Sequence, residues 1–285
     1  MGDLRIATRR SRLAIAQAGM VARLLEKAHP GAEVSLVEVT TSGDRDRTTS
    51  VATLTEVGAF VRAVQEAVLE GRAELAVHSC KDLPVDGPPG LVSAFPERGG
   101  AWDVLCGHDL DTLPPGGRVG TGSPRRAAQM RRLRPDVEVV DIRGNVDTRV
   151  EKLRQGDVDA LILAEAGLTR LGLGDEIRHR FTIEQMVPAP GQGAMAVEAL
   201  EGGPAHAALV DIDHAPTRAA VEAERALLAR TSAGCRSALG ALALSGDDRI
   251  EMAGFVEDEH GPRSGRVRAV TPDEAARRLQ AELGL

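Results

Sequence analysis

Aromatic residues are almost absent from this chain. Its 285 residues include four Phe, one Trp and no Tyr. The cores must therefore be built from aliphatic side chains, and a surface on which single-stranded nucleic acid stacks its bases is not expected. The net charge of -7 points the same way, because a general binder of polyanions carries an excess of positive charge.

Cysteine is also scarce, and long apolar runs are missing. Cys80, Cys106 and Cys235 stand far apart, which favours a reducing compartment and argues against a disulfide framework or a zinc site. No run approaches the ~18 apolar residues that span a bilayer, and the N-terminus lacks the apolar segment of a signal peptide. With 42% hydrophobic and 27% charged residues, the chain is expected to be a globular cytoplasmic protein without a metal, nucleic-acid or membrane partner.

Strand and helix patterns alternate through the first two-thirds of the chain. An order of strand, helix, strand, helix, strand predicts a parallel, doubly wound α/β sheet. The pattern restarts after the Pro-Pro-Gly-Gly sequence at 114–117, which is a candidate hinge or boundary, and the restart indicates a second lobe of the same class. Strands are expected at 4–7, 34–39, 75–77, 137–142 and 160–163, and a further strand is expected to end at 118–119. Helices are expected at 11–27, 60–70, 123–133 and 146–155.

The pattern changes again from about residue 216. One strong helical pattern is followed by three short strand patterns with Gly- and Asp-rich turns between them. A closing helix begins near Pro272, because proline is favourable in a first helical turn. This predicts a small α+β domain, with a helix at 218–230 and strands at 239–244, 250–256 and 266–270.

Arginine, lysine and serine follow four of the expected strands. In an open α/β sheet, ligands bind beyond the carboxyl ends of the strands, so these side chains are candidates for a binding site. One arginine taken alone is more simply explained as a solvated surface residue, but the repetition favours a small ligand with several carboxylates. The four segments are Thr8–Ser11, His78–Asp82, Gly120–Arg126 and Arg143–Asn145, with Arg149 one helical turn further on.

Two of these arginines are expected in the first turn of a helix. Ser123 is a good N-cap and Pro124 a good first helical residue, so Arg125 and Arg126 follow directly. Cations there oppose the helix dipole by about 0.3–1 kcal/mol each. The pair is explained if an anion docks beside the free N–H groups. Nucleic acid is the alternative anion, but the acidity of the chain and its few aromatic residues count against it.

A carboxylate and a thiol complete the candidate reactive groups. Asp82 would stay ionised among cations and could stabilise a developing positive charge or relay a proton; a simple turn residue is the alternative. Cys235 lies in a loop beside Arg236, which would favour the thiolate if close, although most lone cysteines are inert. Cys80 and Cys106 are expected as small buried hydrophobes.

Over nearly its whole length the chain resembles the porphobilinogen deaminase family, also called the hydroxymethylbilane synthases. The order and spacing of several segments carry the resemblance, although each segment alone is a weak pattern. They are 5–11, 78–84, 120–126, 143–149, 166–172, 190–194 and 223–225 with 234–235.

The resemblance implies a chain of three domains. Two α/β lobes would resemble those of a type II periplasmic binding protein, with the active site between them, and a small α+β domain would anchor the cofactor. Crossovers at 94–99 and 187–193 would act as hinges. The polar segment 40–55, which is longer than an ordinary connection, would be a mobile lid. The implied domains are 1–93 with 194–212, 99–187, and 216–285.

The resemblance also implies the chemistry. The family condenses four porphobilinogen molecules head to tail into hydroxymethylbilane in heme biosynthesis and releases ammonia, and its members are usually monomers. Cys235 would hold a dipyrromethane cofactor through a thioether, and Asp82 would be the catalytic group that stabilises cationic intermediates. Cofactor contacts would come from Lys81, Asp82, Ser123, Arg125, Arg126 and Gly144, and substrate contacts from Arg9, Ser11, Phe60, Arg143, Arg149 and Arg170.

The chain departs from the family pattern at three places. A lysine usual before the phenylalanine is missing from Glu56–Phe60, the acidic pair that often follows is changed within Ala63–Glu66, and a proline usual after the cysteine is missing from Arg236–Gly240. Two alternatives therefore stay open. One is a degenerate paralogue that folds but turns over poorly, and the other is a small-anion binding protein on the same scaffold, which would not need Cys235.

Overall fold

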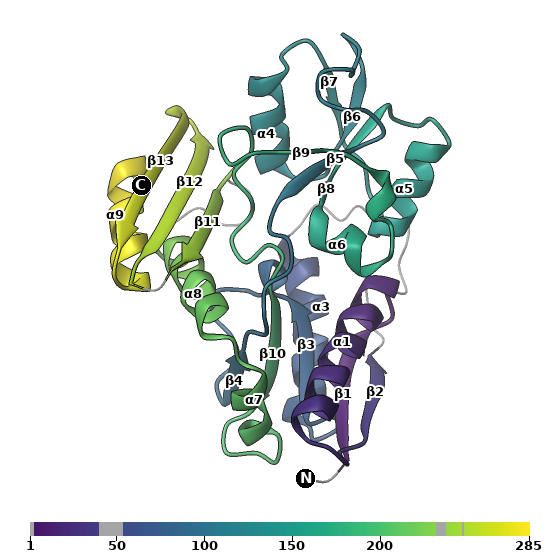
Figure 1. The fold of residues 1–285 in the computed structure, drawn as a ribbon, viewed down its shortest axis with the longest axis vertical. Helices are drawn as coiled ribbons and strands as arrows, with labels where there is room; N and C mark the ends of the chain where they lie inside the picture. Colours follow the sequence, from purple (N-terminus) through teal and green to yellow (C-terminus); the bar gives the residue numbers. More distant parts are fainter. Residues whose placement is uncertain (1–2, 40–53, 232–237, 247) are drawn as a thin grey trace. The chain divides into compact units, whose positions relative to one another are not determined.

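The chain folds into two compact units. The computed structural model describes residues 3–39, 54–231, 238–246 and 248–285. The first unit comprises Met1–Arg98 with Ala194–Arg218, and the second comprises Gly99–Gly193 with Ala219–Leu285. The described residues form three sheets, one in the first unit and two in the second (Figure 1).

The sheet of the first unit is mixed and has the order β2-β1-β3-β10-β4. Strand β1 pairs parallel with β2 and β3, and β10 pairs antiparallel with β3 and β4. Helices α1 and α7 cover one face and α3 covers the other, because successive strand residues point to opposite faces. The elements are β1 (Leu4–Arg9), α1 (Arg12–Ala28), β2 (Val34–Val39), α3 (Leu54–Leu69), β3 (Leu75–Ser79), β4 (Leu91–Ala94), β10 (Met195–Leu200) and α7 (His206–Ile212).

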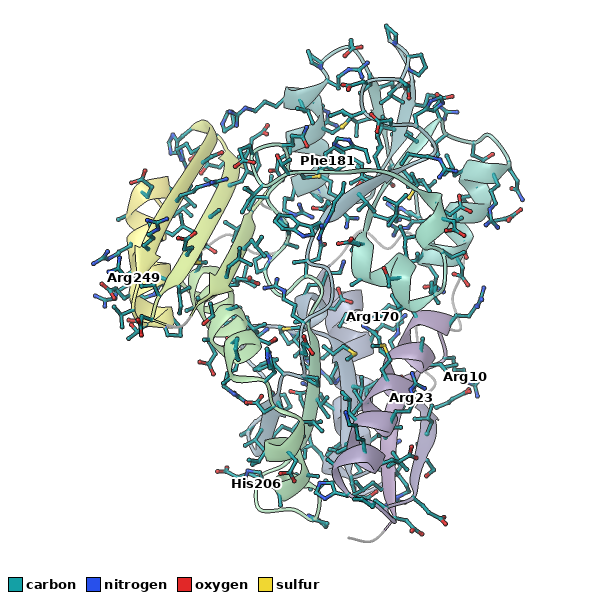
Figure 2. The ribbon with its side chains drawn as sticks, viewed as in Figure 1. Arg10, Arg23, Arg170, Phe181, His206 and Arg249 are labelled. Carbon is teal, nitrogen blue, oxygen red and sulfur yellow. The ribbon has the colours of Figure 1, made fainter. Side chains whose placement is uncertain are left out.

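The first sheet of the second unit repeats this arrangement. Its order is β7-β6-β8-β5-β9, with β6 parallel to β7 and β8, and β5 antiparallel to β8 and β9. Its core contains Phe181, labelled in Figure 2, with Met130 and Ile162. The elements are β5 (Asp103–Cys106), β6 (Arg118–Gly120), α4 (Pro124–Leu133), β7 (Glu138–Val140), α5 (Val146–Arg154), β8 (Ala160–Ala164), α6 (Glu165–Arg170) and β9 (Ile177–Arg180), with a 3₁₀ turn at Gly174–Glu176.

These two sheets confirm the α/β lobes predicted from the sequence, but not an all-parallel sheet. In each lobe, one strand is antiparallel to both of its neighbours: β10 in the first unit and β5 in the second. Each of these strands follows the point at which the chain crosses from the other unit. Strands β10 and β5 were not predicted from the sequence, because both are buried on nearly every residue. A short continuous apolar run has no period that separates a strand from a buried helix.

The last sheet is a small antiparallel meander of order β11-β12-β13. Helices α8 and α9 bury one face of it around Leu227, Met252 and Leu279. Thr271 caps α9 by accepting the Glu274 N–H, and a proline follows the cap, as predicted. The structure thus contains the expected α+β part, whose domain boundary stays a prediction. The elements are α8 (Ala215–Arg230), β11 (Gly240–Ser245), β12 (Ile250–Asp258), β13 (Gly261–Ala269) and α9 (Pro272–Leu283).

The Pro-Pro-Gly-Gly sequence at 114–117 is a turn inside the second unit, so the predicted boundary there was wrong. The Gly117 N–H donates to the Pro114 carbonyl at 3.0 Å, and the turn connects β5 to β6. Proline and glycine mark a reversal of the chain inside a domain as strongly as they mark a linker. No helix in the described parts of the chain is both long and apolar enough to cross a membrane.

Two glycines bring the crossover segments of the second unit together. The Gly99 N–H donates to the Gly193 carbonyl at 3.2 Å. Gly193 has a φ of 84°, and a Cβ placed on it would lie 2.7 Å from the Gly99 carbonyl oxygen. Only glycine combines this left-handed conformation with so close an approach.

Gly193→Ala is therefore expected to lower the free energy of unfolding by about 2–4 kcal/mol, from backbone strain and the clash. Urea unfolding followed by circular dichroism measures the change. Gly174→Ala is the matched control, because a Cβ there meets nothing within 4 Å. Equal stability of the two variants would contradict the close approach.

Candidate active site

Asp82 lies in a short 3₁₀ turn, Cys80–Asp82, directly after β3. The Cys80 N–H donates to the Ala194 carbonyl at 3.0 Å, and the Leu83 N–H donates to the Cys80 carbonyl at 3.1 Å. Cys80 and Leu83 are buried, whereas Lys81 and Asp82 are exposed. Among the described residues, the Asp82 carboxylate makes no hydrogen bond or ion pair. Backbone hydrogen bonds therefore fix the turn that carries Asp82, and the Asp82 carboxylate is accessible to a ligand.

Arg9 and Phe60 are brought together in the same unit. The Arg9 guanidinium, at the end of β1, lies 4.1 Å from the centre of the Phe60 ring on α3. A cation in this position is attracted to the ring face. Within the described structure, the buried Nε of Arg9 has no hydrogen-bond partner. Ser11 is the N-cap of α1 and accepts the Ala14 N–H at 3.3 Å.

Gln17 was missed by the sequence analysis. It is buried on α1, and its Nε2 donates to the Ser79 hydroxyl at 3.0 Å, at the end of β3. A signal was present in the sequence, because Gln17 is four residues before Val21 and eight before Leu25 on the apolar stripe of α1. A polar residue on such a stripe needs a buried partner.

In the second unit, one buried carboxylate binds two arginines. Asp103, the first residue of β5, is 0% exposed. Its Oδ2 accepts from Arg125 at 2.6 Å, and its Oδ1 accepts from Arg126 at 2.8 Å and from Gln192 at 3.0 Å. Burial alone would raise the pKa of Asp103, but the charges of both arginines and these hydrogen bonds hold it well below its usual range. Asp103 is therefore ionised, and it orients both guanidinium groups.

The predicted helix start at Ser123 and Pro124 is confirmed. Ser123 accepts the Arg126 N–H at 3.4 Å, and Pro124 is the first residue of α4. Both arginine side chains, however, turn into the interior of the lobe, so the anion that they bind in the structure is a side chain of the protein. Arg125 also donates to the Val187 carbonyl at 2.6 Å.

Asp103 was not singled out from the sequence. It precedes Arg125 by 22 residues, and nothing local connects the two positions. The available signal was a lone acidic residue at the start of the apolar run Asp103–Cys106, because a charge is almost never fully buried without a partner. The partner itself could not be read from the sequence.

Positive charge exceeds negative charge around this centre. Arg125 and Arg126 share one carboxylate. Burial and the nearby charge of Arg126 lower the pKa of Arg149, and burial lowers the pKa of Arg170 to about 10. Arg170, on α6 (Figure 2), donates to the Gly193 carbonyl at 2.6 Å. Within the described parts of the chain, neither Arg149 nor Arg170 forms an ion pair. Desolvated cations without a counterion fit an anionic ligand.

Gly144 and Arg143 have different positions relative to this group. Gly144 has a φ of 120°, and a Cβ there would lie 3.0 Å from the Thr148 side chain. Its carbonyl accepts from Arg149 Nε at 2.7 Å, so this turn orients Arg149. Arg143 instead pairs with Asp141 at 2.9 Å, and both side chains are more than half exposed. The structure therefore brings Arg125, Arg126 and Arg149 together and leaves Arg143 at the surface.

The cysteines also differ. Cys235 and Arg236 lie outside the described residues. Residues 40–53, which make up most of the predicted lid, lie outside them as well. Cys80 and Cys106 are buried, as predicted, and burial raises the pKa of the Cys106 thiol to about 12. In the described residues, no group of three or more His, Cys, Asp or Glu side chains could hold a metal ion.

The chain is similar in sequence to known proteins over most of its length. A family described as "Porphobilinogen deaminase, dipyromethane cofactor binding domain" matches residues 4–207. A porphobilinogen deaminase of Leifsonia xyli subsp. xyli is 46% identical over 282 residues, which cover 95% of this chain and 85% of the relative. The one of Thermobifida fusca is 44% identical over 290 residues, which cover 99% and 90%. Among solved structures, the chain is similar to the periplasmic VFT2 domain of Bordetella pertussis BvgS, with a TM-score of 0.40 and 16% identity over 73% of this chain and 85% of that one.

Proposed function

The chain belongs to the porphobilinogen deaminase family, and we infer that it condenses four porphobilinogen molecules head to tail into hydroxymethylbilane, with release of ammonia. This is the transferase activity of a hydroxymethylbilane synthase, a step of tetrapyrrole biosynthesis. The observation on this chain that carries the conclusion is the excess of desolvated arginines around Asp103, because porphobilinogen bears an acetate and a propionate on its pyrrole ring.

The cofactor of this family is a dipyrromethane, and we propose that Cys235 holds it through a thioether. When bound, it supplies the free pyrrole carbon to which the first porphobilinogen is joined. The described residues fit such a group, since Arg125 and Arg126 share the single carboxylate of Asp103 and keep a net positive charge for the carboxylates of the cofactor.

We propose that the second unit holds the cofactor and binds carboxylates. Arg125 and Arg126 would present their guanidinium groups from the buried Asp103, with Ser123 and Gly144 at the adjoining turns. Arg149 and Arg170 would bind carboxylates of incoming substrate, and Arg143 would add a contact from the surface. Desolvation supports this assignment, because an ion pair formed away from water is stronger than one in water.

We propose that the first unit provides the catalytic carboxylate. Positive charge develops on the pyrrole ring as ammonia leaves, and the Asp82 side chain would stabilise that charge and accept hydrogen bonds from pyrrole N–H groups at its Oδ atoms. Its exposure and its lack of a partner in the described structure support this role. Lys81 would contact the cofactor, and Arg9, Ser11 and Phe60 would bind substrate at the adjacent strand end.

The same proposal covers the organisation of the protein. The chain would act as a cytoplasmic monomer of three domains, 1–93 with 194–212, 99–187, and 216–285. The main core of each of the three sheets supports this division. The last sheet also shares a small apolar cluster with the second lobe, formed by Ala128, Val187, Ala238 and Phe255.

The intact mass of the purified protein, measured beside Cys235→Ser, tests the function. The wild type is expected to exceed its sequence mass by two linked pyrrole units, because the thioether is covalent, and the variant is expected to lack this excess. Incubation with porphobilinogen should then add single pyrrole units to the wild type only. A wild type that stays unmodified after this incubation would instead support the degenerate-paralogue or binding-protein alternative.

A further inference from the structure

Three polar side chains are buried together in the first unit, and no role proposed above uses them. Gln65, His78 and Glu198 are 3%, 6% and 5% exposed. Gln65 Nε2 donates to the two Glu198 oxygens at 2.9 and 3.2 Å, and His78 Nε2 lies 3.1 Å from Glu198 Oε2 without a hydrogen bond in the described structure. We call these three residues the Glu198 cluster. The layer around it, between α3 and the sheet, is aliphatic.

The Glu198 cluster joins three elements. His78 is on β3 and Glu198 on β10, and the register sets His78 opposite Ala196 and Glu198 opposite Ala76. The two residues are thus diagonal neighbours on one face of the sheet, within reach of long side chains. Gln65 reaches the same point from α3. Hydrogen bonds are directional, so they set the position of α3 along the strands more narrowly than aliphatic contacts do.

Stability alone does not explain such a cluster. A buried carboxylate and amide lose their hydration, and hydrogen bonds between them return only part of that loss. Apolar residues of similar volume often replace buried polar groups with no loss, or with a gain, of stability. What the Glu198 cluster adds is therefore a defined geometry.

That geometry extends to the candidate site. From His78, β3 continues through Ser79 into the turn that carries Asp82, and the Cys80 N–H of that turn binds the Ala194 carbonyl, just before β10. On α3, Phe60 is five residues before Gln65 and contacts Arg9. The Glu198 cluster thus includes a residue of the strand that leads into the Asp82 turn and a residue of the helix that carries Phe60.

We propose that Glu198, acting with Gln65 and His78, is a positioning residue that fixes the position of the Asp82 turn relative to the Phe60–Arg9 pair. The inference rests on the role proposed above for Asp82. Gln65 links Glu198 to α3, because its amide donates to both oxygens of Glu198. A carboxylate side chain at this position would have no N–H group to donate.

Glu198→Met, Glu198→Gln and Glu66→Gln test the proposal. Methionine has a similar volume and no strong acceptor. Glutamine keeps one acceptor oxygen for Gln65 and nearly the shape of glutamate. Glu66, the exposed neighbour of Gln65 on α3, is the matched control. Each holoenzyme is compared with the wild type by amide hydrogen exchange at Cys80 and Leu83, by kcat and KM for porphobilinogen, and by intact mass for cofactor loading.

In Glu198→Met, we expect exchange at Cys80 and Leu83 to become about tenfold faster than in the wild type, while exchange in α1 is unchanged. The value of kcat should fall about 10- to 100-fold, because a small misplacement of a catalytic group has effects of that size. KM should change by less than about threefold, because substrate-binding arginines are retained. Glu198→Gln should recover most of kcat, and Glu66→Gln should match the wild type.

Unchanged exchange at Cys80 and Leu83 with unchanged kcat in Glu198→Met would overturn the proposal. Faster exchange spread evenly over the unit would overturn it as well, because that result indicates only lost stability. If Glu198→Met fails to fold, Gln65→Leu removes the same hydrogen bonds, and the same two readouts decide. A wild type that does not consume porphobilinogen would refute the proposed function instead, and the exchange comparison would still decide on the Glu198 cluster.

Discussion

Asp82→Asn is expected to lower kcat for hydroxymethylbilane formation by at least about 100-fold, because loss of one group that stabilises transition-state charge has effects of about 10²- to 10³-fold. Asparagine keeps the shape of the side chain and removes its negative charge. Asp82 is exposed and has no partner within the described residues, so the fold should be unaffected. Steady-state product formation and thermal unfolding of the same preparation measure both effects.

Asp86→Asn is the matched control for this prediction. Asp86 is an exposed aspartate four residues further along the same loop, and its change to asparagine alters the net charge by the same amount. It should leave kcat within about twofold of the wild type. Full activity in Asp82→Asn would remove this carboxylate from the mechanism, whereas equal losses in both variants would indicate a general effect of charge.

Asp103→Asn is expected to have the largest effect on stability. The change leaves Arg125 and Arg126 as buried cations without their shared carboxylate. Breaking a buried pair in this way lowers the free energy of unfolding by about 3–5 kcal/mol. Urea unfolding at neutral pH measures the loss. Asp157→Asn, an exposed aspartate of the same unit, is the control and should unfold as the wild type does.

The lowered pKa of Asp103 predicts that the free energy of unfolding depends on pH. The folded state holds the pKa of Asp103 below its usual value, so its contribution is fully present above the pKa of the unfolded chain, which is about 3.9. As the pH falls from there towards the folded-state pKa, the contribution is lost. The wild type should therefore lose stability below about pH 4 more steeply than Asp103→Asn. Parallel pH profiles of the two proteins, or equal stability at neutral pH, would contradict the pairing seen in the structure.

Asp82 lies in the turn that follows β3 and Asp103 is the first residue of β5, and the surroundings of the two carboxylates are opposite. One carboxylate is exposed on a turn and is open to a ligand, and the other is enclosed by two arginines and Gln192. The first was identified from its place after a strand and from the family resemblance. The second was missed, because its partners follow it by 22 and 23 residues and a buried ion pair leaves no periodic signal in either segment.

Local features of the sequence were enough to predict much of the fold. Hydrophobic periodicity located Val34–Val39 as a strand and α1 to within a residue at each end, because a strand or helix that buries one face must repeat its apolar residues at a fixed interval. Ser123 and Pro124 predicted the start of α4, since capping depends only on neighbouring residues. The arginines at the strand ends were predicted by the same reasoning, from the edge at which parallel strands end.

The partners of buried groups were decided by the tertiary structure alone. Strands β5 and β10 pair antiparallel with strands that are distant in sequence, and Gln65 meets Glu198 across 133 residues. The sequence does indicate that such polar residues need partners if they are buried. Which partners they find depends on how the crossovers return the chain to each sheet, because pairing across such distances is set by packing of the whole unit and by no local pattern. For that reason the family, the main elements and the place of Asp82 after a strand could be predicted from the sequence, whereas the surroundings of Asp103 and Glu198 became known only from the folded units.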